Sequence, residues 1–206
     1  MSQRHVLVTG FEPFGIDLVN PSQELAKAVE GRRIGDLVVR SLVLPVQHEA
    51  ARARVLPALE EPGLEAILHL GLAGGRARIA LEQVAVNVMD YPIPDARGDV
   101  LRGRPCRAGG LPAHLCTLPL PEILAALTAE GVPAYISYTA GTYLCNYTLY
   151  TTLDELAARA FPVRAGFVHL PFLPAMVAAH GLDEPSMDVN VMLRALEIAL
   201  RVVAEA

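Results

Sequence analysis

The residue best placed to act as a nucleophile is Cys145, which follows a glycine-containing loop and lies at the start of a predicted helix over 144–160. The positive end of a helix dipole lies at such a position and favours the thiolate form of a cysteine. The preceding residues 140–142 let backbone amides approach a substrate closely, which indicates a site for an oxyanion. The alternative is that Cys145 packs as a small buried hydrophobic residue, the usual role of a lone cysteine in an apolar run.

The candidate base for this thiol is His169, which ends a predicted strand 24 residues after Cys145. One helix and one strand separate the two residues, so we expect them to come from adjacent strand ends, where an imidazole can take the thiol proton. The alternative for His169 is a half-buried histidine bonded to the backbone. His69 also lies near a strand end, but it precedes residues 70–71 and is expected to point into the sheet.

The candidate group to orient that imidazole is Glu82, because it interrupts the apolar pattern of residues 79–86. A carboxylate in such a strand is costly unless it is paired or hydrogen-bonded, and a catalytic imidazole needs a partner on its second nitrogen. The alternative is a solvent-facing residue at a sheet edge. Asp90, Asp95 and Asp99 fall in a long excursion and are poorer candidates for a rigid triad.

Two aromatic residues, Phe11 and Phe14, flank a proline in the glycine-bounded loop after the first predicted strand. They predict the apolar wall of a small-molecule pocket, the alternative being a loop tucked onto the core. The turn at 74–76 (Gly-Gly-Arg) invites a phosphate-binding interpretation. It has neither the P-loop nor the dinucleotide-binding spacing, however, so the pattern does not favour a phosphate site.

The elements that must position these residues alternate between strand and helix, which predicts an α/β fold with a mostly parallel sheet covered on both faces. Ligands of such sheets bind beyond the carboxyl ends of the strands. No repeat or linker divides the chain, so we expect one domain over 1–206. The predicted strands are 5–9, 37–44, 65–70, 132–137 and 164–169, with an extended segment at 79–88. The predicted helices are 21–30, 47–60, 119–130, 144–160 and 187–205, and residues 89–118 form a long excursion.

The chain is apolar for its length: 52 % of its 206 residues are hydrophobic, 19 % are charged and its mean hydropathy is +0.36. Such a composition buries enough apolar surface to exclude intrinsic disorder. Two charge-free runs, 131–153 and 165–182, approach the length of a membrane span. Their prolines, hydroxyl side chains and histidines make poor spanning helices, so we expect buried structure and no membrane partner.

The remaining composition bears on partners and compartment. The net charge is −5 and the basic residues form no cluster, which predicts no nucleic-acid partner. The three cysteines, Cys106, Cys116 and Cys145, lack paired-ligand spacing, so we expect no metal site. Their small odd number, with no signal-peptide pattern at the start of the chain, predicts a cytoplasmic location. We interpret Cys106 and Cys116 as structural.

Six sequence blocks together resemble the pyroglutamyl peptidase I family, also called pyrrolidone-carboxylate peptidases. The resemblance implies a cysteine peptidase that removes an N-terminal pyroglutamyl residue from peptides through a thioester. It also implies a three-layer α/β/α sandwich, no metal or other cofactor, and commonly a homotetramer. The blocks, in order, are VTGFEPFG (8–15), NPS (20–22), GLAGGR (71–76), LEQVAVNVMDYPIPD (81–95), AGTYLCNY (140–147) and HLPFLP (169–174).

The resemblance also implies a role for each matching position. The nucleophile of the family corresponds to Cys145, its general base to His169 and its orienting carboxylate to Glu82. Backbone amides around Cys145 and in the Gly71 loop are expected to hold the oxyanion. The pocket for the lactam ring is expected to be lined by Phe11, Phe14, Leu72, Ile93, Tyr143 and Leu144.

Three positions depart from the family pattern. Leu72 stands where the family often has Gln, Gln83 where it has Arg, and Ala96 where it usually has Asn. The first departure removes a polar contact to the substrate, so affinity is expected to differ. Two other functions stay open: a nucleoside phosphorylase-like enzyme on a similar α/β fold, and an oligomer that binds a small ligand without turnover. Neither explains a cysteine, a histidine and a glutamate together at strand ends.

Overall fold

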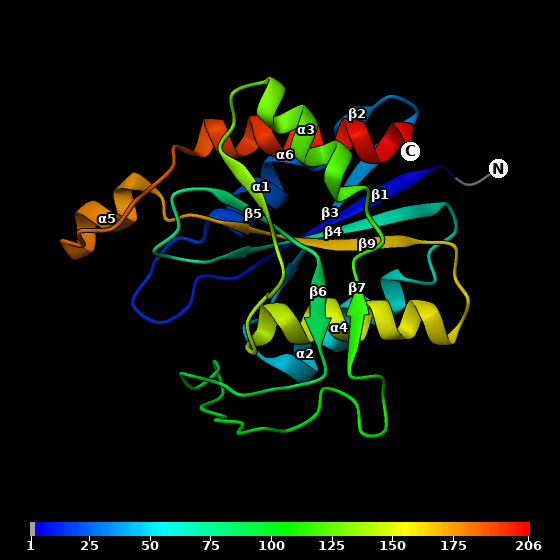
Figure 1. The fold of residues 1–206 in the computed structure, drawn as a ribbon, viewed down its shortest axis with the longest axis horizontal. Coiled ribbons are helices and arrows are strands. Elements are labelled where there is room, and N and C mark those ends of the chain that lie inside the picture. The colour runs from blue at the N-terminus through cyan, green and yellow to red at the C-terminus, as the bar shows by residue number, and fades with distance from the viewer. Residues whose placement is uncertain (1–2) are drawn as a thin grey trace.

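A seven-stranded twisted sheet runs through the centre of the molecule in the order β2-β3-β1-β4-β9-β5-β8 (Figure 1). The structure is a computed structural model that describes residues 3–206. β1, β3, β4 and β9 pair in parallel, β2 is antiparallel to β3, and β5 is antiparallel to β9 but parallel to β8. The mostly parallel sheet is therefore confirmed. The strands are β1 (His5–Phe11), β2 (Arg33–Ile34), β3 (Leu37–Leu44), β4 (Leu64–Leu72), β5 (Ile79–Glu82), β8 (Ala134–Ser137) and β9 (Arg164–Leu170).

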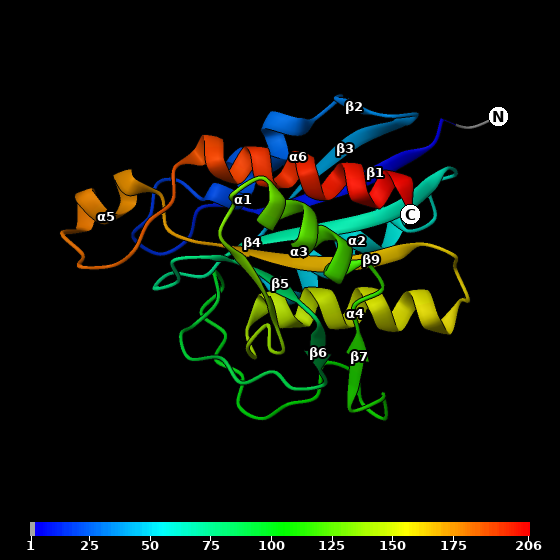
Figure 2. The same ribbon diagram turned by 45° about the horizontal axis from the view of Figure 1, so that its top comes forward.

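Helices cover both faces of the sheet, which confirms the three-layer α/β/α architecture. One face carries α1 (Pro21–Val29), α3 (Leu120–Ala129) and α6 (Val189–Glu205). The opposite face carries α2 (His48–Ala58) and α4 (Leu144–Ala158) (Figures 1 and 2). Each layer encloses its own hydrophobic cluster against the sheet, so the apolar composition reflects two cores that share one set of buried strands.

The start of α1 fixes the loop that follows β1. Asn20 caps the helix by accepting a hydrogen bond from the Ser22 N–H at 3.0 Å, and Pro21 occupies the first turn, where its missing N–H costs nothing. The Ser22 hydroxyl in turn accepts from the Phe11 N–H at 2.9 Å. A methyl group on Gly10 would lie 2.0 Å from the Ser22 carbonyl oxygen, so only glycine permits this approach of strand and helix.

The extended segment predicted at 79–88 is two strands in two different sheets. β5 ends at Glu82, and β6 (Val84–Val86) pairs antiparallel with β7 (Ala113–Leu115) away from the main sheet. Gln83 is the branch point, because its N–H donates to Ser137 in the main sheet and its carbonyl accepts from Cys116. The excursion at 89–118 therefore contains a strand that the sequence pattern did not reveal.

A short helix, α5 (Pro174–His180), was not predicted and protrudes beyond the end of β9 (Figure 1). Its signals are Pro174 in the first turn and Gly181, which takes a left-handed conformation (φ 59°) at the C-terminus. Residues 165–182 form one charge-free run in the sequence, so the pattern did not indicate that a strand ends and a helix begins within it. Among residues 3–206, no helix is both long and apolar enough to cross a membrane.

Candidate active site

Cys145 is the second residue of α4, so its thiol lies at the positive end of the helix dipole. Its side chain is half-buried. A methyl group built on Gly71 of β4 would lie 2.9 Å from the Cys145 sulfur, so the sulfur rests almost against the strand backbone. Gly71 pairs in register with His169 of β9. The cysteine and the histidine therefore meet at the carboxyl ends of β4 and β9.

The route by which these residues meet differs from the one we expected. β8, which precedes Cys145, and β9, which carries His169 near its end, are not neighbours, because β5 lies between them. β5 runs antiparallel to β9, and Glu82 pairs in register with Phe167, two residues before His169. Glu82 and His169 are thus diagonal neighbours on one face of the sheet. An inserted antiparallel strand brings the carboxylate to the histidine.

The imidazole of His169 is held by Glu82. Its Nδ1 lies 2.7 Å from Glu82 Oε1, and both side chains are buried, with 4 % of His169 and none of Glu82 exposed. Glu82 is therefore an interior residue, and the alternative of a solvent-facing edge residue is wrong. Because Nδ1 faces the carboxylate, Nε2 is left to interact with the Cys145 thiol.

Electrostatics favours a charged pair at this site. Burial alone would lower the pKa of His169, but Cys145 and Glu82 outweigh it and raise that pKa to about 9. Burial alone would raise the pKa of Glu82, but its hydrogen bond to His169 and the nearby side chains of Ser137 and Arg76 hold that pKa below its usual value. At neutral pH the arrangement therefore holds an ionised Glu82 beside a histidine that tends to keep its proton, which suits a thiolate–imidazolium pair.

A cavity of about 400 Å³ opens beside the cysteine, within the range of small-ligand pockets. Tyr143 closes one side, and its hydroxyl donates to the Pro94 carbonyl at 3.1 Å, which ties α4 to the excursion. Asp17 is the charged residue of the lining, and it pairs with His180 of α5 at 2.9 Å. The predicted pocket residues found in the lining are Phe11, Phe14, Leu72, Ile93, Tyr143 and Leu144. Gly71 lies outside the lining, against the cysteine sulfur.

Several residues near the site were missed from the sequence. Ile16 and Phe172 also line the pocket. Asn146, directly after the cysteine, is fully buried, and its amide bonds to the Val86 N–H and carbonyl (both 2.8 Å) and to the Val88 carbonyl (3.0 Å). It anchors the first turn of α4 to β6. In the sequence, the one indication of this role was that Asn146 is a polar residue inside the charge-free run 131–153.

The other sequence candidates lie outside the site. His69 is fully buried, as expected, and lies between the sheet and α4, where it bonds to the hydroxyls of Thr9 (2.8 Å) and Thr152 (3.1 Å). Burial lowers its pKa to about 3, so it stays neutral. Burial raises the pKa of Cys106 to about 12 and that of Cys116 to about 11, which leaves both thiols unreactive.

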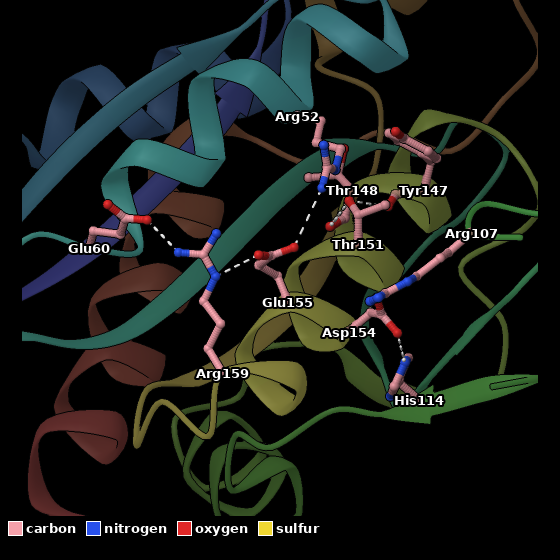
Figure 3. Close-up of polar contacts among 10 residues, drawn as sticks. All are labelled: Arg52, Glu60, Arg107, His114, Tyr147, Thr148, Thr151, Asp154, Glu155 and Arg159. Atoms are coloured by element: carbon pink, nitrogen blue, oxygen red, sulfur yellow. Dashed lines mark hydrogen bonds and ion pairs between the residues drawn. The ribbon is translucent and has the colours of Figure 1, made fainter. Parts of the chain in front are cut away.

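The outer face of α4 carries a separate network of charges (Figure 3). Glu155 accepts from Arg159 at 2.6 Å and from Arg52 of α2 at 3.4 Å. Asp154 lies 3.1 Å from His114 of β7 and also pairs with Arg107. These contacts fasten α4 to its neighbours from the side away from the sheet.

One cluster within residues 3–206 has the composition of a metal site. The ligand atoms of His48, Asp95 and Asp99 lie within 4.8 Å of one another. Asp99 is exposed, and Asp95 Oδ1 already accepts from the backbone N–H groups of Arg97 (2.9 Å) and Asp99 (3.0 Å). The Asp95 carboxylate therefore orders its own loop.

Comparison with known proteins shows which family the sequence of this chain matches. Residues 4–206 match the family model described as Pyroglutamyl peptidase. The chain is 40 % identical to the pyrrolidone-carboxylate peptidase of Pyrococcus furiosus over 203 residues, which cover 97 % of this chain and 98 % of the relative. It is 43 % identical to that of Gloeobacter violaceus over 197 residues, covering 96 % and 95 %.

Solved structures agree with the sequence relatives. A mutant pyrrolidone carboxyl peptidase from Pyrococcus furiosus superposes with a TM-score of 0.94 at 40 % identity, covering 98 % of each chain. The pyroglutamyl peptidase I of Bacillus amyloliquefaciens superposes with a TM-score of 0.95 at 34 % identity, covering 100 % of this chain and 97 % of that one.

Proposed function

Because the chain belongs to the pyroglutamyl peptidase family, we propose that it removes an N-terminal pyroglutamyl residue from peptides by thiol catalysis. The observation that carries the mechanism is the buried His169–Glu82 contact of 2.7 Å beside the cysteine at the start of α4. The family establishes the enzyme class. The roles of Cys145, His169 and Glu82 are our proposal.

The first half-reaction forms a thioester. His169 takes the proton of the Cys145 thiol, the sulfur attacks the carbonyl carbon of the pyroglutamyl residue, and the C=O electron pair moves onto oxygen. Backbone amides near Cys145 and Gly71 hold this oxyanion, each such donor contributing ~3 kcal/mol. The oxyanion then reforms the carbonyl, the C–N bond breaks, and His169 gives its proton to the leaving amine.

The second half-reaction releases the product. His169, now neutral, takes a proton from water, and the hydroxide attacks the thioester carbon. The C–S bond breaks and the thiolate leaves, which regenerates Cys145 and frees pyroglutamate. Glu82 keeps Nδ1 of the imidazole occupied throughout, so that Nε2 does the proton transfers.

The pocket explains why a blocked N-terminus would be selected. A pyroglutamyl ring is neutral and compact, and it fits a wall made by Phe11, Phe14 and Tyr143. A free α-ammonium group would have to lose its hydration against these apolar side chains. Asp17, the charged residue of the lining, is already paired with His180.

The test is release of a fluorophore from a pyroglutamyl amide. The wild-type chain should turn over this amide but not the matching prolyl amide. Cys145→Ala should abolish turnover, and Cys106→Ser, which alters a thiol outside the pocket, should keep it. Equal turnover by Cys145→Ala would overturn the mechanism. Phosphorolysis of a nucleoside by the same preparation would favour the phosphorylase alternative.

We also propose a homotetramer and a cytoplasmic location, which follow from the family resemblance and the cysteine content respectively. Light scattering on the purified chain tests the assembly directly. A mass of four chains is the expected result, and a monomer at micromolar concentration would contradict it.

A further inference from the structure

Arg76 bonds to the same carboxylate oxygen as the candidate catalytic histidine. Its Nη1 lies 3.0 Å from Glu82 Oε1, and His169 Nδ1 lies 2.7 Å from that atom. The arginine belongs to the loop between β4 and β5, and 29 % of its side chain is exposed, whereas Glu82 is fully buried. The other oxygen, Glu82 Oε2, is buried without a hydrogen-bond partner. Two donors therefore converge on Oε1 and none on Oε2.

We propose that Arg76 is a positioning residue, which fixes the Glu82 carboxylate toward His169 and limits how strongly that carboxylate stabilises the imidazolium. This inference rests on the catalytic roles proposed above. The terminal torsion of a glutamate is broad, so a single bond to the imidazole leaves the carboxylate free to tilt. A second donor that binds the same oxygen from a different direction restricts rotation of the carboxylate about this torsion.

The loop geometry supports a dedicated contact. Gly75 takes a left-handed conformation (φ 76°), which non-glycine residues rarely adopt, and it turns the chain immediately before Arg76. The guanidinium then reaches from a partly exposed loop to a fully buried carboxylate. An arginine without this role would leave its charge in water, as the nearby exposed Arg78 does while it stacks on Tyr135 (4.5 Å to the ring centroid).

The charge of Arg76 opposes that of a protonated His169. The other groups that face His169 are the Cys145 sulfur from α4 and Glu82 from β5. His69 of β4 is neutral and lies beyond the Phe167 ring, whose centroid is 4.7 Å from that of His169. Removing the guanidinium charge should let His169 keep its proton to higher pH. An imidazolium that is too basic gives up its proton poorly to a leaving amine.

The experiment compares Arg76→Gln with Arg78→Gln, which removes the same charge from the same loop but touches no part of the site. The pH dependence is read from the rate of Cys145 alkylation by iodoacetamide, followed by peptide mass spectrometry, and from kcat/KM on a pyroglutamyl amide. In Arg76→Gln the alkaline limb of kcat/KM should move up by about 0.5 pH unit, and Arg78→Gln should leave it in place. Alkylation needs no substrate, so it reports on the ion pair even if the proposed peptidase activity fails.

Loss of the bond itself is tested with Arg76→Met, which keeps an unbranched, flexible side chain but has no hydrogen-bond donor. We expect kcat to fall about ten-fold with little change in KM. In a Glu82→Gln background the same replacement should have no further effect, because Arg76 acts through Glu82. A rise in KM alone, an equal loss in both backgrounds, or unchanged kcat and pH profiles would each overturn the proposal.

Discussion

Gly71 and Cys145 are so close that one added methyl group would touch the sulfur, at 2.9 Å from Sγ. The same methyl would lie 2.7 Å from the Phe167 ring, which packs between the buried His69 and His169. The absence of a side chain at Gly71 is therefore what lets the first turn of α4 dock on the carboxyl ends of β4 and β9. This contact places the Cys145 sulfur beside the strand ends that carry the rest of the site.

Gly71→Ala should lower both stability and activity. Overpacking of this kind costs about 1–3 kcal/mol of unfolding free energy, and displacement of the sulfur should reduce kcat of the folded protein by about 100-fold. Gly166→Ala is the matched control, since its methyl would meet Cys116 Sγ at 2.7 Å, a thiol outside the pocket. Urea melts and single-turnover rates separate the two effects. Equal activity in the two variants would contradict the role of Gly71.

Glu82→Gln should reduce kcat by about 100-fold or more and leave the fold intact, because the amide cannot stabilise the imidazolium. The carboxylate helps to raise the pKa of His169 to about 9. Its loss should therefore move the alkaline limb of kcat/KM downward, opposite in sign to the shift expected for Arg76→Gln. Glu184→Gln, an exposed carboxylate near Gly75, serves as the control. A pH profile equal to wild type would remove Glu82 from the mechanism.

Phe14→Ala should weaken substrate binding. Phe14 lines the pocket and is half-buried, so its loss removes about 1–2 kcal/mol of apolar contact, a five- to thirty-fold drop in kcat/KM. Leu18→Ala is the control: Leu18 belongs to the same loop but is 92 % exposed and lies outside the lining. Michaelis–Menten curves on a pyroglutamyl amide distinguish them, and a drop of the same size in Leu18→Ala would argue for a general loop effect.

Asn146→Ala should destabilise the protein by about 2–4 kcal/mol, because it leaves the Val86 N–H without its partner and removes two further hydrogen bonds, to the carbonyls of Val86 and Val88. Activity should fall with it, since Asn146 anchors the turn that carries Cys145. Asn190→Ala, at an exposed position of α6, should stay within about 0.5 kcal/mol of wild type. Chemical denaturation of both variants gives the comparison.

His69 should make the protein less stable in mild acid. Burial lowers its folded-state pKa to about 3, whereas an unfolded histidine titrates near 6.5. Below pH 6.5 only the unfolded state takes up this proton, so stability should fall toward lower pH by up to ~1.4 kcal/mol per pH unit. Urea midpoints measured between pH 6.5 and 5 test this, because most carboxyl groups titrate at lower pH and contribute little to the change. In His69→Gln the slope should flatten, and an unchanged slope would refute the assignment.

The sequence by itself determined the layered α/β fold and the catalytic candidates. Continuous apolar runs bounded by glycine and proline predict buried parallel strands, and the structure has them as β1, β4 and β9. A carboxylate inside an apolar strand predicts a paired group, and Glu82 is buried against His169. These signals are local, because the cost of burying a charge or of continuing a helix past proline is carried by each residue itself.

Only the tertiary structure decided how the candidates meet. Strand order and direction depend on contacts between segments far apart in the chain, which no local pattern records. The insertion of antiparallel β5 between β8 and β9 puts Glu82 beside His169. The packing of α4 brings Cys145 against Gly71. The Arg76–Glu82 contact, likewise, depends on a turn at Gly75 and a buried acceptor that appear only when the loop and sheet are folded together.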